Sequence, residues 1–229
     1  MTSKQRPLIE MFYDVISPYS WLAFEALTRY RTIWNVEMKF RPFFLGAVMQ
    51  KTGNNPPMMV PAKGLYAHKD LHRQRAYWSV PLQEIKDPFE ALVTKGSLKA
   101  GRFLVSLERV RPEKCEDAAR ELWMRRWHHD KDIHLAEHFL EVCDAIGLEK
   151  AVGHDVVAKI EHKDVKQTLI DNTNQAVDEY GAFGAPWIVV HKPDNKPDCY
   201  FGSDRFPVIA WSIGEKYPGA MRDIAKSKL

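Results

Sequence analysis

Length, composition and charge limit the classes to which this chain can belong. It has 229 residues, 45% hydrophobic and 28% charged, which indicates a folded domain with room for a large insertion. It contains no run of about 18 uncharged apolar residues, so we expect no membrane span. The formal charge of +3 is too small to indicate nucleic-acid binding, although it is compatible with small anionic ligands.

The N-terminus and the cysteines indicate a reducing compartment and no signal peptide. The opening stretch MTSKQRPLIEMF lacks the apolar core of a signal peptide, because the run from residue 8 already reads as a strand. Cys115, Cys143 and Cys199 form no C-x-x-C pair, and three cysteines cannot all be paired within one chain. We therefore expect reduced, mostly structural thiols.

The chain opens with a predicted β-α-β unit. Residues 8–15 form an apolar, strand-like run, and residues 18–33 carry large apolar side chains at helical spacing. Residues 36–44 alternate as a second strand, which Pro42 interrupts. The stretch 53–64 is rich in glycine, asparagine and proline and is a predicted loop.

A long helical block separates this unit from the end of the chain. From about residue 62 to residue 179, nearly every segment has helical period. Residues 186–190 and 199–202 then read as short strands joined by a DNKP turn, and residues 204–215 as a final helix. The order predicts the α/β class, as a thioredoxin-like domain with a large all-helical insertion.

We expect residues 1–61 and 180–229 to form the thioredoxin-like domain and residues 62–179 the inserted helical domain. In the thioredoxin arrangement, the active site lies at the N-terminus of the first helix and faces a cis X-Pro bond before the third strand. Ala185-Pro186 is the predicted cis bond, and the glycines of YGAFGAP permit the close backbone approach that it needs. Redox thioredoxins begin this helix with C-x-x-C, but here the stretch reads SPYS, which excludes dithiol exchange at this site.

The SPYS motif by itself allows two interpretations, helix capping and anion binding. Serine before a proline is a common helix start, because Ser17 can accept an orphan backbone N–H and Pro18 has none to leave unpaired. A strand-to-helix junction also points free N–H groups at one place, where a small polar side chain can bind an anion. The motif alone favours capping.

The sequence closely resembles the kappa-class glutathione transferases over nearly its whole length. The matching stretches are FYDVISPYSW (12–21), GNNPP (53–57), KGLY (63–66), KGSLKAGRFL (95–104), RELWMRRW (120–127), YGAFGAP (180–186) and FGSDRF (201–206). The resemblance implies a homodimer that joins glutathione to electrophiles. It also implies kinship with bacterial disulfide oxidoreductases and with 2-hydroxychromene-2-carboxylate isomerase.

The resemblance also implies a catalytic residue. Ser17 would donate its hydroxyl to the sulfur of glutathione and stabilise the nucleophilic thiolate, with help from the first-helix amides. Pro18 and Tyr19 would adjoin the glutathione site, with Tyr19 either lining the mouth of the electrophile site or covering the helix end. Ala185, before Pro186, would bind the cysteinyl unit through its backbone N–H and C=O.

The two ends of glutathione have their own expected partners. Ser203 and Asp204 resemble the family's γ-glutamyl site, where Asp204 would meet the ammonium and Ser203, with helix amides, the carboxylate. From the residues alone, Ser203 reads as a plain N-cap. Asn54 and Lys63 resemble the groups that hold the glycine end.

Histidine pairs do not predict a metal site here. His134 and His138 are four residues apart in a segment of helical period, as are His68 and His72, and such pairs can bind zinc. Neither pair belongs to an H-E-x-x-H motif. We expect no metal and no cofactor, with glutathione acting as co-substrate.

Two further pairs in the RELWMRRW stretch have structural interpretations. Trp123 and Trp127 share one helical face, which predicts core packing rather than a ligand platform. Arg125 and Arg126 read as a solvated face.

The favoured function is therefore detoxification by glutathione transfer to electrophiles, with hydroperoxides as further substrates. A glutathione-dependent isomerase and a non-catalytic glutathione-binding protein are the alternatives. The last tripeptide, Ser227-Lys228-Leu229, is the address that the peroxisomal import receptor reads. It predicts residence in the peroxisome, with a mitochondrial pool as an addition.

Overall fold

The computed structural model describes residues 6–193 and 196–225, so Ser227-Lys228-Leu229 lies outside the described residues. The strands are β1 (Leu8–Tyr13), β2 (Glu37–Pro42), β3 (Trp187–His191) and β4 (Asp198–Phe201). The helices are α1 (Pro18–Tyr30), α2 (Leu45–Thr52), α3 (Pro61–Trp78), α4 (Leu98–Glu108), α5 (Cys115–Trp127), α6 (Ala136–Ala145), α7 (Lys150–Ala158), α8 (Lys163–Asn174), α9 (Phe206–Ile213) and α10 (Arg222–Ala225). Short helical turns are η1 (Pro57–Met59), η2 (Glu90–Lys95), η3 (Pro112–Lys114) and η4 (Gln175–Glu179).

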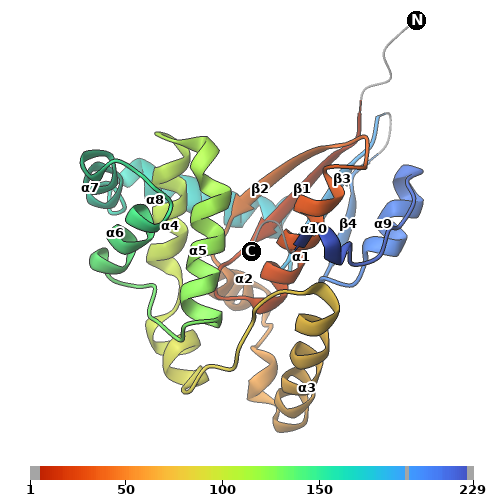
Figure 1. Ribbon diagram of the computed structural model, residues 1–229, viewed down its shortest axis with the longest axis horizontal. Helices are drawn as coiled ribbons and strands as arrows, with labels where there is room; N and C mark the ends of the chain where they lie inside the picture. The colour runs from red at the N-terminus through yellow and green to blue at the C-terminus, as the bar shows by residue number, and fades with distance from the viewer. Residues whose placement is uncertain (1–5, 194–195, 226–229) are drawn as a thin grey trace, which may run out of the picture.

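The strands form one mixed sheet in the order β2-β1-β3-β4 (Figure 1). β1 runs parallel to β2 and antiparallel to β3, and β4 is antiparallel to β3. The two central strands are apolar and buried along nearly their whole length, whereas the edge strands alternate between buried and exposed positions. Central strands need apolar residues on both faces because both faces are covered. The predicted α/β class is confirmed.

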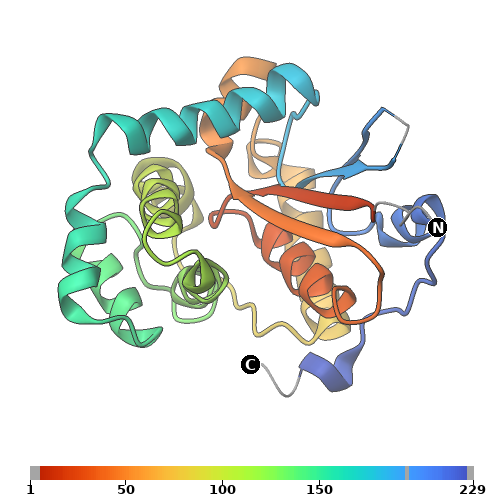
Figure 2. The ribbon, with the colours of Figure 1, turned by 90° about the horizontal axis from the view of Figure 1, so that it is seen from above.

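Alternate residues of β1 face two different apolar layers. Met11 and Tyr13 belong to the large core that includes α1, whereas Phe12 belongs to a smaller cluster built from α2, η4 and β3. Figure 2 shows α1 and α8 on opposite sides of the strands. Side chains alternate across a strand with a period of two, so one short apolar strand anchors helices on both faces of the sheet.

Helices α4 to α8 gather at one side of the sheet (Figures 1 and 2). The large core is continuous across this junction, because it joins strand residues to helical residues such as Phe103, Trp123 and Val156. The limits of the expected domains, 1–61 with 180–229 and 62–179, therefore stay a prediction. None of the helices in the described part of the chain combines the length and apolarity that crossing a bilayer requires.

The loop between the β-α-β unit and the helical block is shorter than predicted. Residues 45–52 form α2, which the sequence analysis did not predict, and Gly53 ends it in the left-handed conformation with φ 72°. The helix α3 then begins at Pro61, inside the stretch 53–64 that reads as a loop. Proline is favoured in the first turn of a helix, so the proline-rich composition marked a helix start as well as a loop.

The RELWMRRW stretch is mostly buried, and none of its residues is exposed. Trp123 and Trp127 are core residues, as predicted. The prediction of a solvated face for Arg125 and Arg126 is wrong, because both arginines are buried. Arg125 Nη1 pairs with Glu141 Oε2 at 2.5 Å. Arg126 pairs with two carboxylates, Asp130 Oδ1 and Asp132 Oδ1, the latter at 3.2 Å. Arginine tolerates burial when its guanidinium is paired, so the charge sequence alone is a poor guide to exposure.

Candidate active site

Ser17 caps the first helix and is only 6% exposed. Its extended backbone (φ −92°, ψ 117°) places the side-chain Oγ where it accepts the backbone N–H of Ser20 at 3.2 Å. Pro18 occupies the first helical position, where its missing N–H leaves nothing unpaired. The capping interpretation is therefore confirmed, and the same geometry places the Ser17 hydroxyl at the N-terminal end of the α1 dipole.

The Ser17 hydroxyl also reaches the loop before β3. Its Oγ donates to the carbonyl oxygen of Ala185 at 3.3 Å, and the Ala185-Pro186 peptide bond is cis, as predicted. Pro186 is in turn tied to the end of β4, because its carbonyl accepts the N–H of Gly202 at 3.2 Å. The structure thus brings together the start of the first helix and the X-Pro loop.

Asn54 is fastened to the same loop. Its Nδ2 donates to the carbonyl oxygen of Phe183 at 2.6 Å. Gly184 in the same loop permits the close approach of Phe201, because a Cβ there would lie 2.7 Å from Cε2 of that ring. Lys63 lies in the first turn of α3 with an exposed side chain and has no ion-pair partner among residues 6–193 and 196–225. No contact of the described residues ties Lys63 to Ser17.

Ser203 and Asp204 lie in the turn that follows β4. Ser203 is buried and Asp204 is exposed. The helix α9 begins at Phe206 with Arg205 in the cap position, so Ser203 is not the N-cap of that helix. Gly202, at φ 99°, makes the turn close enough that a Cβ would lie 2.9 Å from Asp204 Oδ1.

Tyr19 links the first helix to α3. Its hydroxyl donates to Asp70 Oδ2 at 3.0 Å. Burial raises the pKa of Tyr19 above its ordinary value, and the neighbouring Asp70, Tyr66 and Asp204 raise the pKa further. The phenol therefore stays protonated and remains a hydrogen-bond donor at physiological pH. The hydrogen bond to Asp70 therefore joins the first turn of α1 to α3.

The cysteines do not offer a reactive thiolate. Burial raises the pKa of Cys115 to about 12 and that of Cys143 to about 11, and burial also raises the pKa of Cys199. A thiol with a raised pKa is a poor nucleophile at neutral pH. All three are free cysteines, which fits the expectation of structural thiols.

One ring nitrogen of the histidine pair in the helical block is committed to the backbone. His138 Nδ1 accepts the N–H groups of His134 and Leu135 at 3.3 and 3.2 Å, so this ring nitrogen has no lone pair left for a metal. Burial lowers the pKa of His138, which keeps the ring neutral. Among the described residues, no group of three or more His, Cys, Asp or Glu side chains is arranged to hold a metal ion.

Comparison with known proteins agrees with this geometry. The sequence model of the DsbA-like thioredoxin domain matches residues 8–214. Glutathione S-transferase kappa 1 from Rattus norvegicus is 40% identical over 222 residues, which are 97% of each chain. The chain belongs to the kappa class of glutathione transferases. The Homo sapiens kappa 1 protein is 39% identical to this kappa-class chain, covering 96% of this chain and 97% of that protein.

Solved structures share the fold of this kappa-class chain. A 2-hydroxychromene-2-carboxylate isomerase superimposes with a TM-score of 0.71 at 15% identity, covering 97% of this chain and all of that one. The cytosolic disulfide reductase DsbM from Pseudomonas aeruginosa, solved with GSH, gives a TM-score of 0.60 at 11% identity, with coverage of 97% and 100%. These likenesses establish a thioredoxin-like fold with additional helices.

Asp70 is a partner of Tyr19 that the sequence does not reveal. Asp70 lies in the stretch AHKDLH of α3, where no motif distinguishes its carboxylate from those of other surface residues. Only its hydrogen bond to Tyr19 marks it. The stretch KGLY, which resembles the family, lies one to two helical turns before Asp70 on α3. It is the part of the sequence nearest to Asp70 that indicates a site.

Proposed function

We propose that this chain is an enzyme that transfers glutathione to electrophiles, with Ser17 as the residue that stabilises the glutathione thiolate. The observation that carries the proposal is the hydroxyl of Ser17 at the N-terminus of α1, 3.3 Å from the carbonyl of Ala185 beside the cis-proline. Full-length relatives at about 40% identity, named glutathione S-transferase kappa, support the activity.

The thiolate is the species that must be stabilised. A free thiol of this type has a pKa of about 8.5–9, so only a small fraction is ionised at neutral pH. Lowering that pKa by about two units requires roughly 2.7 kcal/mol of preferential stabilisation of the anion. One charge-assisted hydrogen bond from Ser17 and the partial positive charge of the helix N-terminus can supply this amount. The serine acts as a donor throughout and needs no general base.

Binding of glutathione would replace the hydrogen bond between Ser17 and Ala185 with one hydrogen bond between each of them and glutathione. In the structure, the Ser17 hydroxyl donates to the carbonyl of Ala185. When the cysteinyl unit pairs with the Ala185 backbone, its N–H takes this carbonyl, and the Ser17 hydroxyl turns to the sulfur. The small side chain of Ala185 leaves the peptide groups accessible. Asn54, fixed to the Phe183 carbonyl, and Lys63, on the exposed first turn of α3, would hold the glycine end.

The γ-glutamyl end would bind between α1, α3 and the turn after β4. Exposed Asp204, whose Oδ1 lies 3.4 Å from Arg205 Nε, would meet the ammonium group, and buried Ser203 would donate to the carboxylate. Tyr19, which donates to Asp70 on α3, would adjoin this part of the site. The exposed aromatic ring of Tyr66, on the same helix as Asp70, would form part of the wall against which an electrophile packs.

A charge-neutral change at Asp204 tests this placement. Asp204→Asn is expected to raise the dissociation constant of glutathione about fivefold to tenfold, because the ammonium loses an opposite charge at an exposed site. Isothermal titration gives this constant. A glutathione analogue without the α-amino group is expected to bind both proteins equally. The matched control is Asp198→Asn, which removes an exposed carboxylate paired with Lys192 on β4. Equal affinities of Asp204→Asn and the unmodified chain would refute the placement.

The activity itself is tested with a panel of acceptors. Aryl halides and organic hydroperoxides are supplied with glutathione, and product formation is followed at steady state. Turnover of either class supports a transferase, with detoxification as its purpose. A 2-hydroxychromene-2-carboxylate substrate, supplied with glutathione in the same assay, tests for the isomerase. Glutathione binding without any turnover would leave only a binding protein and overturn the proposal.

We also propose a homodimer. Apolar side chains remain exposed on the monomer, among them Val208 and Trp211 on α9, at 49% and 81%. Apolar surface of this kind is commonly covered in assemblies. Sedimentation at micromolar concentration is expected to give about twice the 26.5 kDa of one chain. A mass near 26.5 kDa would contradict the dimer.

A further inference from the structure

A tight turn carries Ser17 from β1 to α1, and Asp14 closes it. The N–H of Ser17 donates to the backbone carbonyl of Asp14 at 3.0 Å. The N–H of Ile16 donates to Asp14 Oδ1, also at 3.0 Å. Asp14 is only 4% exposed, so its carboxylate depends on protein donors rather than on water. The groups that fix Asp14 in place therefore also fix the position of Ser17.

The helical block holds this turn from one side. Ser97, the residue before α4, donates its hydroxyl to Asp14 Oδ2 at 2.8 Å. The backbone N–H of Leu45 donates to the same oxygen at 2.9 Å. Ser97 is 3% exposed and makes no capping bond to its own helix, so its hydroxyl is committed to Asp14. The contact ties a residue 83 positions away in the chain to the start of the turn.

The helical block also holds the turn from the other side. Trp123, on α5, donates its indole N–H to the backbone carbonyl of Ser17 at 3.2 Å. The first bond of the helix, from Trp21 N–H to the same carbonyl, is long at 3.3 Å. Ordinary helical N–H to oxygen bonds lie near 2.9–3.0 Å. The indole is therefore a second donor to a carbonyl that the first turn of α1 binds only weakly.

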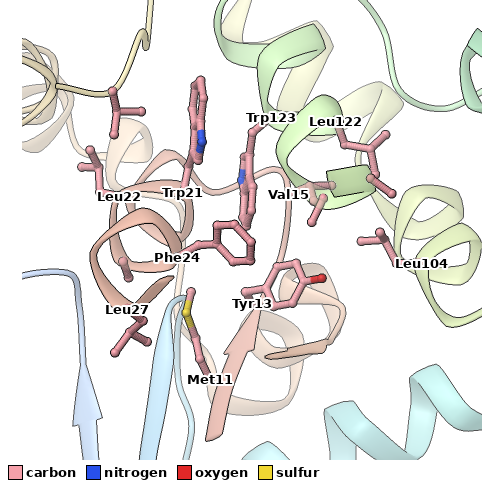
Figure 3. Packing of buried hydrophobic residues seen from close by; sticks show 14 of the residues in the cluster. Met11, Tyr13, Val15, Trp21, Leu22, Phe24, Leu27, Leu104, Leu122 and Trp123 are labelled. Carbon is pink, nitrogen blue, oxygen red and sulfur yellow. The ribbon is translucent and has the colours of Figure 1, made fainter. Parts of the chain in front are cut away.

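Trp123 is itself rigidly placed. It is fully buried, with its ring centroid 5.1 Å from that of Phe24 and 5.3 Å from that of Tyr13. Figure 3 shows the indole between α1 and the end of β1, with its nitrogen facing the start of α1. Close packing on both sides prevents the indole from moving with the turn. The position of α5 therefore determines where the indole N–H meets the Ser17 carbonyl.

We propose that Trp123 and Ser97 are positioning residues, which hold the 14–17 turn from α5 and α4 and so aim the Ser17 hydroxyl at the sulfur of bound glutathione. The inference rests on the proposed function, because it takes Ser17 as the donor to that sulfur. The inserted helices then do more than enclose a substrate. A hydrogen bond weakens steeply as its angle departs from linear, so a small rotation of the turn reduces the stabilisation of the thiolate.

Two conservative variants test the inference. Trp123→Phe removes the indole N–H but keeps an aromatic ring in the core, and Ser97→Ala removes one hydroxyl. Each is expected to raise the pKa of the thiol of bound glutathione by about 0.5 unit, a roughly threefold change in its ionisation constant. Turnover measured well below the thiol pKa should fall by a similar factor, with the glutathione dissociation constant changed less than about twofold. The thiolate absorbance near 240 nm, followed against pH, reports the first quantity.

Matched controls separate positioning from general destabilisation. Trp34→Phe removes an indole N–H that donates to the carbonyl of Lys216 at 3.0 Å in the same core. Ser106→Ala removes a buried hydroxyl that donates to the carbonyl of Val156 at 2.8 Å, also from α4. Both residues are about as buried as their counterparts, and the hydrogen bond that each substitution removes does not involve the 14–17 turn. They are expected to lower the melting temperature without moving the thiol pKa.

The outcomes distinguish this inference from the proposed function. If the unmodified chain lowers the pKa of bound glutathione and Trp123→Phe and Ser97→Ala leave it there, the positioning role is overturned and the proposed function stands. If the unmodified chain does not bind glutathione, the proposed function fails. A crystal structure of the variant that combines Trp123→Phe and Ser97→Ala then tests the positioning role. If Ser17 Oγ still lies beside the Ala185 carbonyl, the positioning role is overturned. If Ser17 is displaced, the positioning role is supported.

Discussion

Replacing Ser17 with alanine is expected to reduce turnover at neutral pH about tenfold, while glutathione affinity stays within a few-fold. The hydroxyl contributes to the thiolate, whereas the peptide backbone and the γ-glutamyl group keep their partners. The helix N-terminus also keeps its share of the stabilisation, so the variant loses about 1.5 of the two pKa units, which lowers the thiolate fraction at pH 7 by about this factor. A pH titration of bound glutathione near 240 nm should show a thiol pKa about 1.5 units higher than in the unmodified chain. An unchanged thiol pKa in Ser17→Ala would refute the mechanism.

The cap makes a control necessary. Ser17→Ala also leaves the Ser20 N–H without its acceptor, which should cost about 1 kcal/mol of stability. Ser20→Ala is the matched variant, because its buried hydroxyl has no hydrogen-bond partner among the described residues. That variant is expected to keep the depressed thiol pKa and most of the turnover. Melting curves of both variants show how much of the loss in Ser17→Ala comes from folding.

Replacing Glu25 with alanine is expected to cause the largest loss of stability, about 3 kcal/mol. The carboxylate is 3% exposed and accepts from Trp21 Nε1 at 3.2 Å and from Arg120 Nε at 2.7 Å. Its removal leaves an indole N–H unpaired in the core. It also leaves Arg120, which is 18% exposed, with Asp117 at 3.5 Å as its one remaining ion-pair partner among the described residues. The cost arises from desolvated donors that lose their acceptor.

Thermal and denaturant unfolding measure the loss of stability in Glu25→Ala, and Glu116→Ala is the control. For a domain of this size, about 3 kcal/mol corresponds to a melting temperature lower by about 6–12 °C. Glu116→Ala breaks a second ion pair between the end of α1 and α5, with Arg31 at 2.6 Å. That pair is 40% and 34% exposed, so its loss should cost less than about 1 kcal/mol. Equal losses for the two variants would show that burial does not decide the value of these pairs.

Some features of this protein follow from short-range rules and were therefore legible in the sequence. Ser17 and Pro18 start a helix because capping involves a side chain and N–H groups only three residues away. The mostly apolar run at residues 8–15 predicts a strand, which forms as β1 with apolar residues buried on both faces of the sheet. The family motifs then identify Ala185-Pro186 as the partner of the first helix, which the structure confirms.

Other features depend on contacts that no local pattern encodes. Ser17 and Ala185 are 168 residues apart, and Asp70 reaches Tyr19 over 51 residues, so only the packed chain shows these bonds. Asp70 has no distinguishing sequence context. The exposed position of Lys63 likewise shows no link to the site that its motif predicts.

The sequence by itself determined the order of elements, the start of α1 and the family of the chain, because these depend on composition, periodicity and local hydrogen bonding. Only the tertiary structure decided which charges are buried and what supports Ser17. Arg125 and Arg126 read as surface residues, yet Arg125 pairs with Glu141 of α6, and Arg126 pairs with Asp130 and Asp132 in the stretch after α5. The sequence predicts Trp123 only as a core residue, yet its indole N–H donates a hydrogen bond to the backbone carbonyl of Ser17. A hydrophobic pattern specifies that a residue is buried, whereas its polar atoms find their partners only when distant segments are folded together.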